Sequence, residues 1–407
     1  MRVLIASISW PPETFLARLL EGLLTYDYIE LTVASEQRPS KEWFSNSNFK
    51  WIHAPGWSGP KARRLTRVAL LFAKTVLRAP GSLKWIAKES SEADGQVTKL
   101  QTWYRHLPFT SGKWDIIYIP WIGGANTYGG LLKLDIPVIV SCRGSQVNVY
   151  PHNPQKKHLD AQLRTAFEQV DIVHCVSDDI KREAFRYGLN PAKAVVIRPA
   201  VDPDFFHLST SELQNISHFC VVSTGSLIWH KGYEYALIAI RRLVDRGIPV
   251  RYDIIGTGNE QQRLLYTIYD LDLVDHVRLL GQLRPTEVRD RLQQADAFLL
   301  SSLSEGISNA VLEAMACGLP IVTTDCGGMR EAVTNSVEGF VVPTRDPLAT
   351  AEALVQLSQD PELRRRMGAA ARQRVLQDFQ LEDQVVQFVR LFRGRRSIIN
   401  RATIPFN

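Results

Sequence analysis

The sequence has 407 residues, 45% of them hydrophobic and 22% charged, which is typical of globular proteins large enough for two or three domains. No apolar run is long enough to span a bilayer, the start lacks a signal-peptide pattern, and the five cysteines form no C-x-x-C pair. We therefore expect a cytoplasmic protein with neither a disulfide framework nor a zinc site. The formal net charge of +6 allows an anionic partner without selecting one.

Short apolar, β-branched runs alternate with helix-length segments over the first half of the chain. These runs are RVLIASIS, IELTVAS, DIIYIP, PVIVSC, DIVHCVS and AVVIRPAV. Continuous apolar strands separated by helices are typical of a parallel sheet that is buried on both faces. We therefore expect residues 1–200 to form one doubly wound, Rossmann-like α/β domain.

The first expected strand leads into SWPPETFLARLLEGL, where a helix should begin near Thr14 and Phe15. The first amides of a helix lack intrahelical partners and lie at the positive end of its dipole. The amides of Thr14 and Phe15 are therefore candidates for binding an anionic group. As the first turn of an ordinary capped helix, the same residues would need no ligand.

Residues 61–88 contain eight Lys or Arg residues and no acidic residue, interleaved with Leu, Val, Phe and Trp. A basic amphipathic stretch of this kind can lie on an anionic membrane or hold a lipid-phosphate acceptor. The alternative is a pair of helices that pack their apolar faces inward and expose their charges. No nucleic-acid-reading module surrounds the stretch, so we do not expect nucleic-acid binding.

The second half of the chain repeats the pattern of the first. Pro, Asp, Ser and Thr interrupt the periodicity at residues 201–217, which we expect to be a linker. The runs HFCVVSTG, RYDIIG, HVRLLG, AFLLSS, PIVTTD and GFVVP then predict a second α/β domain over residues 218–380. Residues 381–407 are expected to hold a C-terminal helix that can return to the first domain, and a basic, poorly ordered tail after Gly394.

The stretch SEGISNAVLEAMACGLP follows an expected strand of the second domain. The pattern predicts a loop that carries Glu305, followed by a short helix that carries Glu313 about one turn after its start. Asn309 is the expected N-cap of this helix, and Gly318 is the expected residue just after its end. Ligands of α/β sheets bind at the carboxyl ends of strands, and backbone amides at a helix start can hold a phosphate or a sugar hydroxyl. Alternatively, both glutamates are charges that stabilise the helix dipole.

This stretch resembles the E-x7-E signature of the retaining nucleotide-sugar glycosyltransferases of family 4 (group 1), which have the GT-B fold. The resemblance extends to EAMACGLPIV, GGMREAV, GTGNEQQRL, VRLLGQL and RRRMGAAARQRV, and covers the second domain more strongly than the first. The PPETF segment resembles a subset of exopolysaccharide and lipopolysaccharide transferases. The family implies two Rossmann-like domains facing across a cleft, an N-terminal one for the acceptor and a C-terminal one for the donor.

The resemblance assigns roles to particular residues. It implies that Glu305 orients the donor sugar, that Glu313 binds the ribose and that Leu283 lies at the base. Around these, the donor-binding set would be Gly225, Ser226, Gly306, Ile307, Ser308, Asn309, Thr14 and Phe15. Lys231 resembles the lysine of the family's phosphate motif and would hold the leaving diphosphate.

Two positions depart from the family pattern. Ser226 stands where the family has an arginine, and Arg143 stands where it commonly has a histidine. We hypothesise that Arg143 supplies the missing guanidinium to the diphosphate, because its fork binds phosphate oxygens bidentately. The alternative is an ordinary strand-end arginine that pairs with a local acid.

The sequence therefore predicts a retaining glycosyltransferase that moves a sugar from a nucleotide diphosphate sugar to a hydroxyl of a glycan or lipid-linked saccharide. Cell-surface polysaccharide biosynthesis is the expected setting. No metal or other cofactor is expected, and residues 61–88 are a candidate contact with the inner face of an anionic membrane. A nucleotide-sugar epimerase, a sugar phosphorylase and a non-catalytic nucleotide-sugar-binding partner remain as alternatives.

Overall fold

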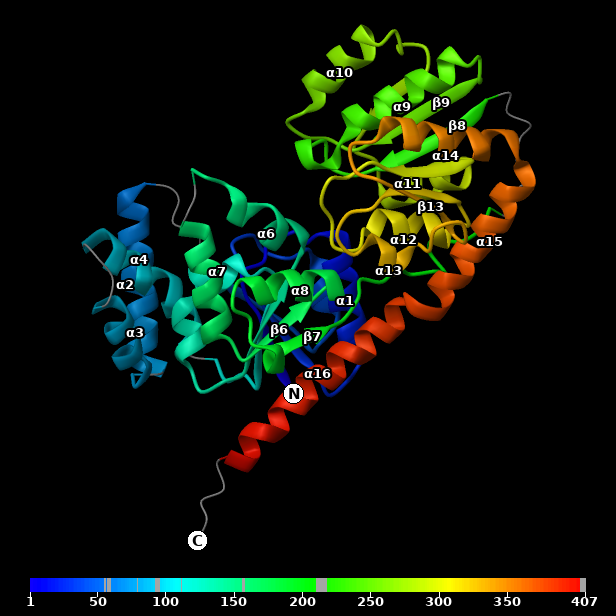
Figure 1. Ribbon diagram of the computed structural model, residues 1–407. Coiled ribbons are helices and arrows are strands. Elements are labelled where there is room, and N and C mark those ends of the chain that lie inside the picture. Colours follow the sequence, from blue (N-terminus) through cyan, green and yellow to red (C-terminus); the bar gives the residue numbers. More distant parts are fainter. Residues whose placement is uncertain are drawn as a thin grey trace.

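The computed structural model describes residues 1–54, 56, 60–78, 80–91, 96–110, 112–155, 158–209 and 218–402. Over this part of the chain it forms two α/β domains set side by side, each built on one parallel sheet (Figure 1). The expected fold class, two doubly wound domains, is confirmed. Residues 210–217 of the expected linker and residues 403–407 of the expected tail lie outside the described residues.

The N-terminal sheet has seven parallel strands in the order β3-β2-β1-β4-β5-β6-β7. The order reverses direction between β1 and β4, so the loops that follow these two strands flank a crevice at the carboxyl edge. The strands are β1 (Arg2–Ile5), β2 (Glu30–Ser35), β3 (Phe49–His53), β4 (Ile116–Ile119), β5 (Val138–Cys142), β6 (Ile172–Cys175) and β7 (Ala194–Val196).

The α-helices of this domain connect the strands, and most of them pack on one or the other face of the sheet. They are α1 (Thr14–Leu24), α2 (Lys61–Arg78), α3 (Ser82–Ser91), α4 (Gln96–His106), α5 (Gly123–Thr127), α6 (Gly144–Asn148), α7 (His158–Gln169) and α8 (Asp178–Arg186). Helix α1 begins at Thr14, as the sequence predicts, and buries five leucines against the sheet. This packing fixes the start of α1 at the carboxyl edge of β1.

The C-terminal sheet has six parallel strands in the order β10-β9-β8-β11-β12-β13. All six strands that the sequence predicts for this domain are present: β8 (Phe219–Thr224), β9 (Val250–Ile255), β10 (Val277–Gly281), β11 (Ala297–Leu300), β12 (Ile321–Thr324) and β13 (Gly339–Val342). The helices are α9 (Tyr233–Asp245), α10 (Gln261–Asp270), α11 (Pro285–Gln293), α12 (Asn309–Ala316), α13 (Met329–Ala332), α14 (Pro347–Gln359) and α15 (Pro361–Asp378). The sheet reverses between β8 and β11, so its crevice opens beside the ends of these strands.

The last helix, α16 (Leu381–Ala402), runs back across the N-terminal domain (Figure 1). Phe388 and Phe392 of α16 are buried in the core that α1 forms with the N-terminal sheet. Helix α16 continues past Gly394, the residue after which the sequence predicts a basic tail, and ends at Ala402. One glycine inside a helix costs only about 1 kcal/mol relative to alanine, which the good helix formers around it can offset.

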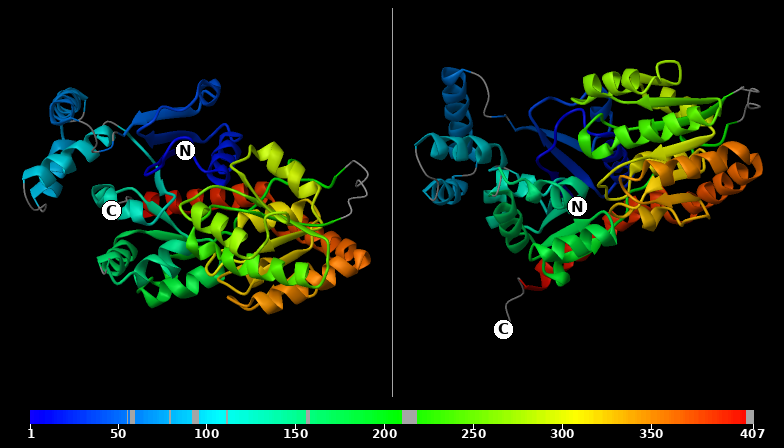
Figure 2. Two further views of the ribbon diagram at one scale, coloured as in Figure 1. Left: turned by 90° about the horizontal axis from the view of Figure 1, so that it is seen from above. Right: turned by 45° about the horizontal axis from the view of Figure 1, so that its top comes forward.

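Helices α2, α3 and α4 form a group that projects from the N-terminal sheet, at the end away from the C-terminal domain (Figures 1 and 2). Inside the group, Ile86 and Tyr104 are fully buried. The Thr75 hydroxyl of α2 bonds the Thr110 hydroxyl at 2.8 Å. The side of α2 opposite Thr75 is in solvent and carries the exposed Leu70 and Leu77. The alternative in which residues 61–88 pack all their apolar faces inward therefore does not hold for α2.

Candidate functional site

An open cavity of about 550 Å³ lies between the two domains, where the start of α1 faces the carboxyl ends of β8 and β9. Seven residues of the predicted donor-binding set line this cavity: Thr14, Phe15, Gly225, Ser226, Leu283, Asn309 and Glu313. The remaining lining residues are Glu13, Arg18, Ala200, Thr224, Ile255, Gly256, Thr257, Gln282 and Val288. Residues far apart in the sequence, from both domains, therefore meet at one cavity.

Glu313 lies in the first turns of α12 and faces this cavity. Burial raises the pKa of the Glu313 carboxyl to about 7, and the positive charge of Arg18 opposes that rise only in part. A carboxylate held in such a place is an acceptor for hydroxyl donors, and those hydrogen bonds would favour its ionised form. Glu313 is therefore suited to bind a diol such as the two hydroxyls of a ribose.

The loop before α9 brings Lys231 against Glu305. The Lys231 Nζ lies 2.5 Å from the Glu305 Oε1, and the Ser302 hydroxyl donates to the same oxygen at 2.7 Å. Gly232, with φ of 62°, makes the turn into α9, and a Cβ there would lie 2.3 Å from the Ser301 carbonyl oxygen. The close backbone contact fixes the Lys231 stem beside β11, whose following loop carries Glu305.

Lys231 also lies beside Gly225, which lines the cavity. A Cβ at Gly225 would lie 3.6 Å from the Lys231 Cε, and a Cβ at Gly256 would lie 1.9 Å from the Gly225 carbonyl oxygen. The turn after β9 is thus pressed onto the turn after β8, with no room for a side chain at Gly256. The result is a bare stretch of backbone next to a lysine, an arrangement suited to phosphate oxygens.

The loop from Glu305 to Ser308 contacts the N-terminal domain. A Cβ at Gly306 would lie 2.7 Å from a methyl group of Val176, and a Cβ at Gly144 would lie 2.8 Å from the Gly306 nitrogen. Ile307 and Ser308 are buried. Gly306, Ile307 and Ser308 are therefore not among the residues that line the cavity, but they position the start of α12, which does.

The predicted N-cap of α12 is wrong by one residue, because Ser308 is the cap and Asn309 is the first helical residue. The Asn309 side chain is consequently free of a capping bond, and its Oδ1 is buried without a hydrogen-bond partner in the described part of the chain. The Ser304 hydroxyl and Oδ1 of Asn148 share this condition. Buried polar groups normally have partners, so these atoms are candidates to bind ligand hydroxyls at the cleft.

The structure places Arg143 beside the cavity rather than among its lining residues. Its guanidinium carbon lies 4.0 Å from the centroid of the Phe15 ring and 5.1 Å from that of Trp121. Its Nε donates to the Pro120 carbonyl at 3.4 Å. In this arrangement Arg143 supports Phe15, whose amide lies at the start of α1, and its contact with a phosphate stays a hypothesis.

Arg18, which the sequence reasoning missed, lines the cavity from the N-terminal domain. Its guanidinium lies over the rings of Phe205 and Phe206, at 5.4 and 5.1 Å from their centroids. It is close enough to Glu313 to lower the pKa of that carboxyl. Arg18 is one turn into α1, and its helical spacing from Thr14 (i, i+4) was a usable signal that both face the same side.

Among the residues that the structure describes, no group of three or more His, Cys, Asp or Glu side chains is placed to hold a metal ion. None of the described helices has the length and apolar character needed to cross a membrane.

Comparisons with known proteins agree with this geometry. Residues 49–205 match the model of Glycosyltransferase Family 4, and residues 211–374 match that of Glycosyl transferases group 1. The chain is a member of the family 4, group 1 glycosyltransferases. It is therefore a transferase enzyme, as the sequence predicts.

Two relatives illustrate how far the similarity extends. The transferase is 29% identical over 317 residues to the amylovoran biosynthesis glycosyltransferase AmsK of Erwinia amylovora, which is 74% of either chain. It is 31% identical over 229 residues to WcaL of Salmonella typhimurium, which is named for colanic acid biosynthesis. That match spans 54% of this chain and 56% of WcaL, or about half of each.

Solved structures show the same GT-B fold over nearly the whole chain. Anabaena HepE, solved in complex with UDP-glucose, superposes with a TM-score of 0.72 at 17% identity, covering 97% of this chain and all of HepE. Sucrose-phosphate synthase of Thermosynechococcus elongatus superposes with a TM-score of 0.75 at 16% identity, covering 98% of this chain and all of that one. The predicted GT-B architecture of the transferase is confirmed.

Proposed function

We propose that this transferase moves a sugar from a nucleoside diphosphate sugar to a hydroxyl of a glycan or lipid-linked saccharide, with retained anomeric configuration. The observation that carries the proposal is the interdomain cavity lined by Glu313 and Gly225, with Lys231, which is paired with Glu305, beside Gly225. The names of AmsK and WcaL support a role in cell-surface polysaccharide biosynthesis. The UDP-glucose complex of HepE supports a nucleotide-sugar donor.

In this proposal the donor lies in the cavity at Leu283 and extends past Gly225 toward the Lys231–Glu305 pair. The base would lie by Leu283, and the ribose hydroxyls would donate to the Glu313 carboxylate. The amides of Thr14 and Phe15, at the positive end of α1, face the same cavity and would bind the diphosphate. No metal or other cofactor is required in this scheme, since backbone amides and cations hold the phosphates.

Two cations would neutralise the charge that develops on the leaving diphosphate. Lys231 comes from the C-terminal domain, and Arg18 comes from the N-terminal domain. Preorganised cations of this kind act on the transition state, where the negative charge grows. Arg18 thus takes the role that the missing arginine at position 226 leaves open, and Arg143 would assist by supporting Phe15.

The donor sugar would lie at Glu305, which can orient its hydroxyls while Lys231 holds the adjacent phosphate. The leaving phosphate would take the proton of the attacking hydroxyl on the same face of the sugar. That route retains the anomeric configuration without a side-chain nucleophile. The proton moves from the acceptor oxygen to a phosphate oxygen as the glycosidic bond forms and the sugar–phosphate bond breaks.

A second cavity, of about 330 Å³, is a candidate acceptor site in the N-terminal domain. It lies at the carboxyl ends of β1, β2 and β3 and is lined by Ser9, Glu36, Arg105 and Tyr128 among others. Polar groups with an aromatic ring suit a saccharide, since hydroxyls need partners and sugar faces pack on rings. The projecting helix α4 contributes Arg105, and the acceptor is proposed to reach this site beside that helix group.

We also propose that the transferase works in the cytoplasm as a peripheral protein at the inner face of the membrane. Residues 61–88 are the proposed contact, because they are basic, amphipathic and partly in solvent. This location suits a lipid-linked acceptor, whose saccharide would be presented at the membrane surface.

The test is a thermal-shift screen of the protein with UDP, GDP, ADP and their sugar conjugates, with and without a chelator. A nucleotide at about a hundred times its dissociation constant should stabilise the protein by about 2.7 kcal/mol. One nucleotide should raise the midpoint for wild type but not for Glu313→Ala. If no nucleotide shifts wild type, the proposal is wrong.

Turnover separates the remaining functions. The proposed transferase should hydrolyse its donor slowly without an acceptor and keep the anomeric configuration when it transfers. An epimerase would release a changed sugar, a phosphorylase would need inorganic phosphate, and a binding partner would bind the nucleotide without turnover.

A further inference from the structure

The solvent face of α2 is apolar. Leu65, Leu70 and Leu77 are 45, 67 and 84% exposed, and Val76 is 44% exposed. They lie on one half of the helix, while Thr75 on the other half is buried against the domain. An amphipathic helix normally turns its apolar side toward the core, so a continuous apolar strip in solvent marks an interaction surface.

Basic groups lie along one edge of this apolar strip. Arg67 and Lys74 are seven residues apart, two turns along the same side of α2. Arg67 donates to the hydroxyl of the buried Tyr104 at 3.4 Å, whereas Lys74 is exposed. No acidic residue occurs between Lys61 and Lys88. An apolar face with a basic border and no acid is the pattern of helices that lie in the surface of anionic bilayers.

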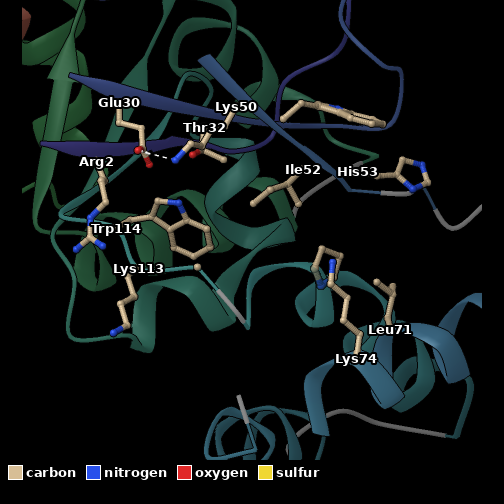
Figure 3. A pocket seen from close by; sticks show the side chains of 13 residues that line it. Arg2, Glu30, Thr32, Lys50, Ile52, His53, Leu71, Lys74, Lys113 and Trp114 are labelled. Atoms are coloured by element: carbon tan, nitrogen blue, oxygen red, sulfur yellow. Dashed lines mark ion pairs between the residues drawn. The ribbon is translucent and has the colours of Figure 1, made fainter. Parts of the chain in front are cut away.

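A groove of about 600 Å³ extends this basic edge from α2 to the amino edge of the N-terminal sheet (Figure 3). It is lined by Arg2, Lys50, Lys74 and Lys113 together with neutral residues and Glu30. Glu30 is already paired with Lys50 at 2.6 Å. Lys74 and Lys113 form no ion pair with any described residue, so the groove keeps positive charge available for anionic headgroups.

A second apolar patch on the molecule lacks this charge pattern. Tyr266 and Tyr269 of α10 are 67 and 74% exposed, but Asp270, Asp272 and Asp275 follow them directly. That patch would be repelled by an anionic surface. Charge therefore distinguishes the α2 face from a merely exposed apolar surface, and it selects an anionic lipid surface as the partner.

We propose that α2 lies in the headgroup region of an anionic bilayer, with Leu70 and Leu77 among the acyl chains and Lys74 and Lys113 at the lipid phosphates. The helix group projects away from the C-terminal domain (Figure 2). The inference deepens the peripheral contact proposed above and rests on it for the site of action. Its test measures lipid binding alone, so its failure is distinguishable from a failure of the transferase proposal.

The first test is co-sedimentation of the full chain with vesicles of phosphatidylcholine, alone or mixed with phosphatidylglycerol. Wild type should bind the mixed vesicles, and added salt should weaken binding. The double variant Leu70→Ser/Leu77→Ser should bind the mixed vesicles with an affinity lower by roughly tenfold or more, because two apolar side chains no longer enter the membrane. The vesicle affinity of Lys74→Glu/Lys113→Glu should fall at least as much, since each basic side chain contributes roughly fivefold to the affinity for an anionic membrane.

The matched control is Tyr266→Ser/Tyr269→Ser on α10, which should bind like wild type. Equal losses in this control and in Leu70→Ser/Leu77→Ser, or equal binding to phosphatidylcholine alone, would overturn the proposal. If Leu70→Ser/Leu77→Ser instead dissociates a dimer in light scattering and keeps full vesicle binding, the face belongs to a second copy of the chain and the proposal also fails.

A second measurement places the helix directly. All five native cysteines are buried, so a nitroxide label can be attached selectively at Leu77→Cys or, as a control, at Tyr269→Cys. On mixed vesicles the label at position 77 should become accessible to oxygen and shielded from a water-soluble relaxation agent. The label at position 269 should stay in water. Equal aqueous accessibility at both positions would overturn the proposal.

Discussion

The Lys231 ammonium and the Glu305 carboxylate form an ion pair of 2.5 Å at the cleft, with 17 and 14% of their side chains exposed. The pair joins the proposed phosphate-binding cation to the proposed sugar-binding carboxylate. A ligand phosphate would add a second anion beside Lys231 and leave Glu305 free to accept sugar hydroxyls. Each residue therefore orients the other before the donor binds.

Lys231→Ala should lower kcat/KM for sugar transfer by roughly 10²–10³, the loss seen when one preorganised donor to a developing anion is removed. Glu305→Gln should lower kcat as well, because the amide keeps the shape but loses the negative charge beside the reacting sugar. Steady-state kinetics with a purified acceptor or donor hydrolysis measures both. The control is Arg246→Ala, which breaks an ion pair with Glu352 on the exposed surface of the same domain and should keep the wild-type rate. Wild-type kinetics in Lys231→Ala would exclude the proposed phosphate contact.

Glu313→Gln should stabilise the ligand-free protein above pH 7. Burial raises the pKa of this carboxyl from 4.5 to about 7, so the folded state binds its proton more tightly than the unfolded state. Stability from this group is therefore lost as the pH rises from 4.5 to about 7, and the penalty is constant above that. At about 1.4 kcal/mol for each pH unit between the two values, the gain in the variant is at most about 3 kcal/mol.

The measurement is the thermal midpoint of wild type and Glu313→Gln as a function of pH. The difference should be largest at pH 8 and should shrink as the pH falls through 7 toward 4.5. If the thermal midpoints of wild type and Glu313→Gln differed by the same amount at every pH, the raised pKa would not belong to Glu313. Glu362→Gln, an exposed carboxylate on α15, provides the comparison and should change nothing.

Nucleotide affinity should depend on the ionisation of the same carboxyl. If ribose hydroxyls donate to the Glu313 carboxylate, binding requires the ionised form, and wild-type affinity should fall as the pH drops below about 7. Calorimetry in two buffers of different ionisation enthalpy should detect a released proton near pH 7. Glu313→Gln should bind weakly with a flat pH profile. A steep acid decline that persists in this variant would assign the effect to another group.

The sequence predicted the sheets and the E-x7-E layout because both depend on local pattern. Apolar runs mark buried parallel strands, and a loop followed by a helix places Glu305 and Glu313 on the same edge. The edge strand β3 was missed, since only Phe49 of its five residues is buried and its polar positions hide the pattern. Edge strands depend on one neighbour and leave a weaker signal.

Other features depend on tertiary contacts that no local pattern contains. Amphipathicity showed that α2 has an apolar face, but only the packing of Thr75 shows that this face points outward. The position of Arg143 after β5 predicts a phosphate contact, which stays a hypothesis. The contact of its guanidinium with the Phe15 ring, more than a hundred residues away in sequence, could not be predicted from local pattern. Arg18 stands outside any family motif, and although its spacing from Thr14 places both on one side of α1, its contacts with Phe205 and Phe206 are tertiary.

Arg18→Ala should weaken binding of a nucleoside diphosphate by roughly tenfold or more, as expected for loss of a hydrogen bond between charged groups. Affinity for the corresponding nucleoside should change little, because Arg18 is proposed to act on phosphate. Titration calorimetry with the nucleoside, monophosphate and diphosphate separates these cases. Arg143→Lys is the comparison: it should keep diphosphate affinity better than Arg18→Ala if Arg143 only supports Phe15. Equal losses for nucleoside and diphosphate in Arg18→Ala would make Arg18 a packing residue.

Glu331 of α13 links the two domains at the start of α8. Its carboxylate accepts from the backbone nitrogens of Asp178 and Asp179 at 3.2 and 3.0 Å, and from Nε of Arg198 at 3.0 Å. The acid thus caps a helix of the N-terminal domain from the C-terminal domain, where the helix dipole favours negative charge. The contact stabilises the arrangement in which Thr14 and Gly225 face one cavity.

Glu331→Ala should therefore open the cleft and raise the KM for the donor, because only the fraction of molecules with the domains correctly placed can bind it. We expect roughly a tenfold rise in KM with a smaller change in kcat, since several charge-assisted hydrogen bonds are lost together. Small-angle scattering should show a larger radius of gyration without donor and recovery of the wild-type value at saturating donor. Glu362→Ala, which breaks an ion pair within α15, should leave both quantities unchanged. A wild-type radius together with a wild-type KM in Glu331→Ala would mean that the other interdomain contacts, such as that between Gly144 and Gly306 and the packing of α16, hold the domains in place.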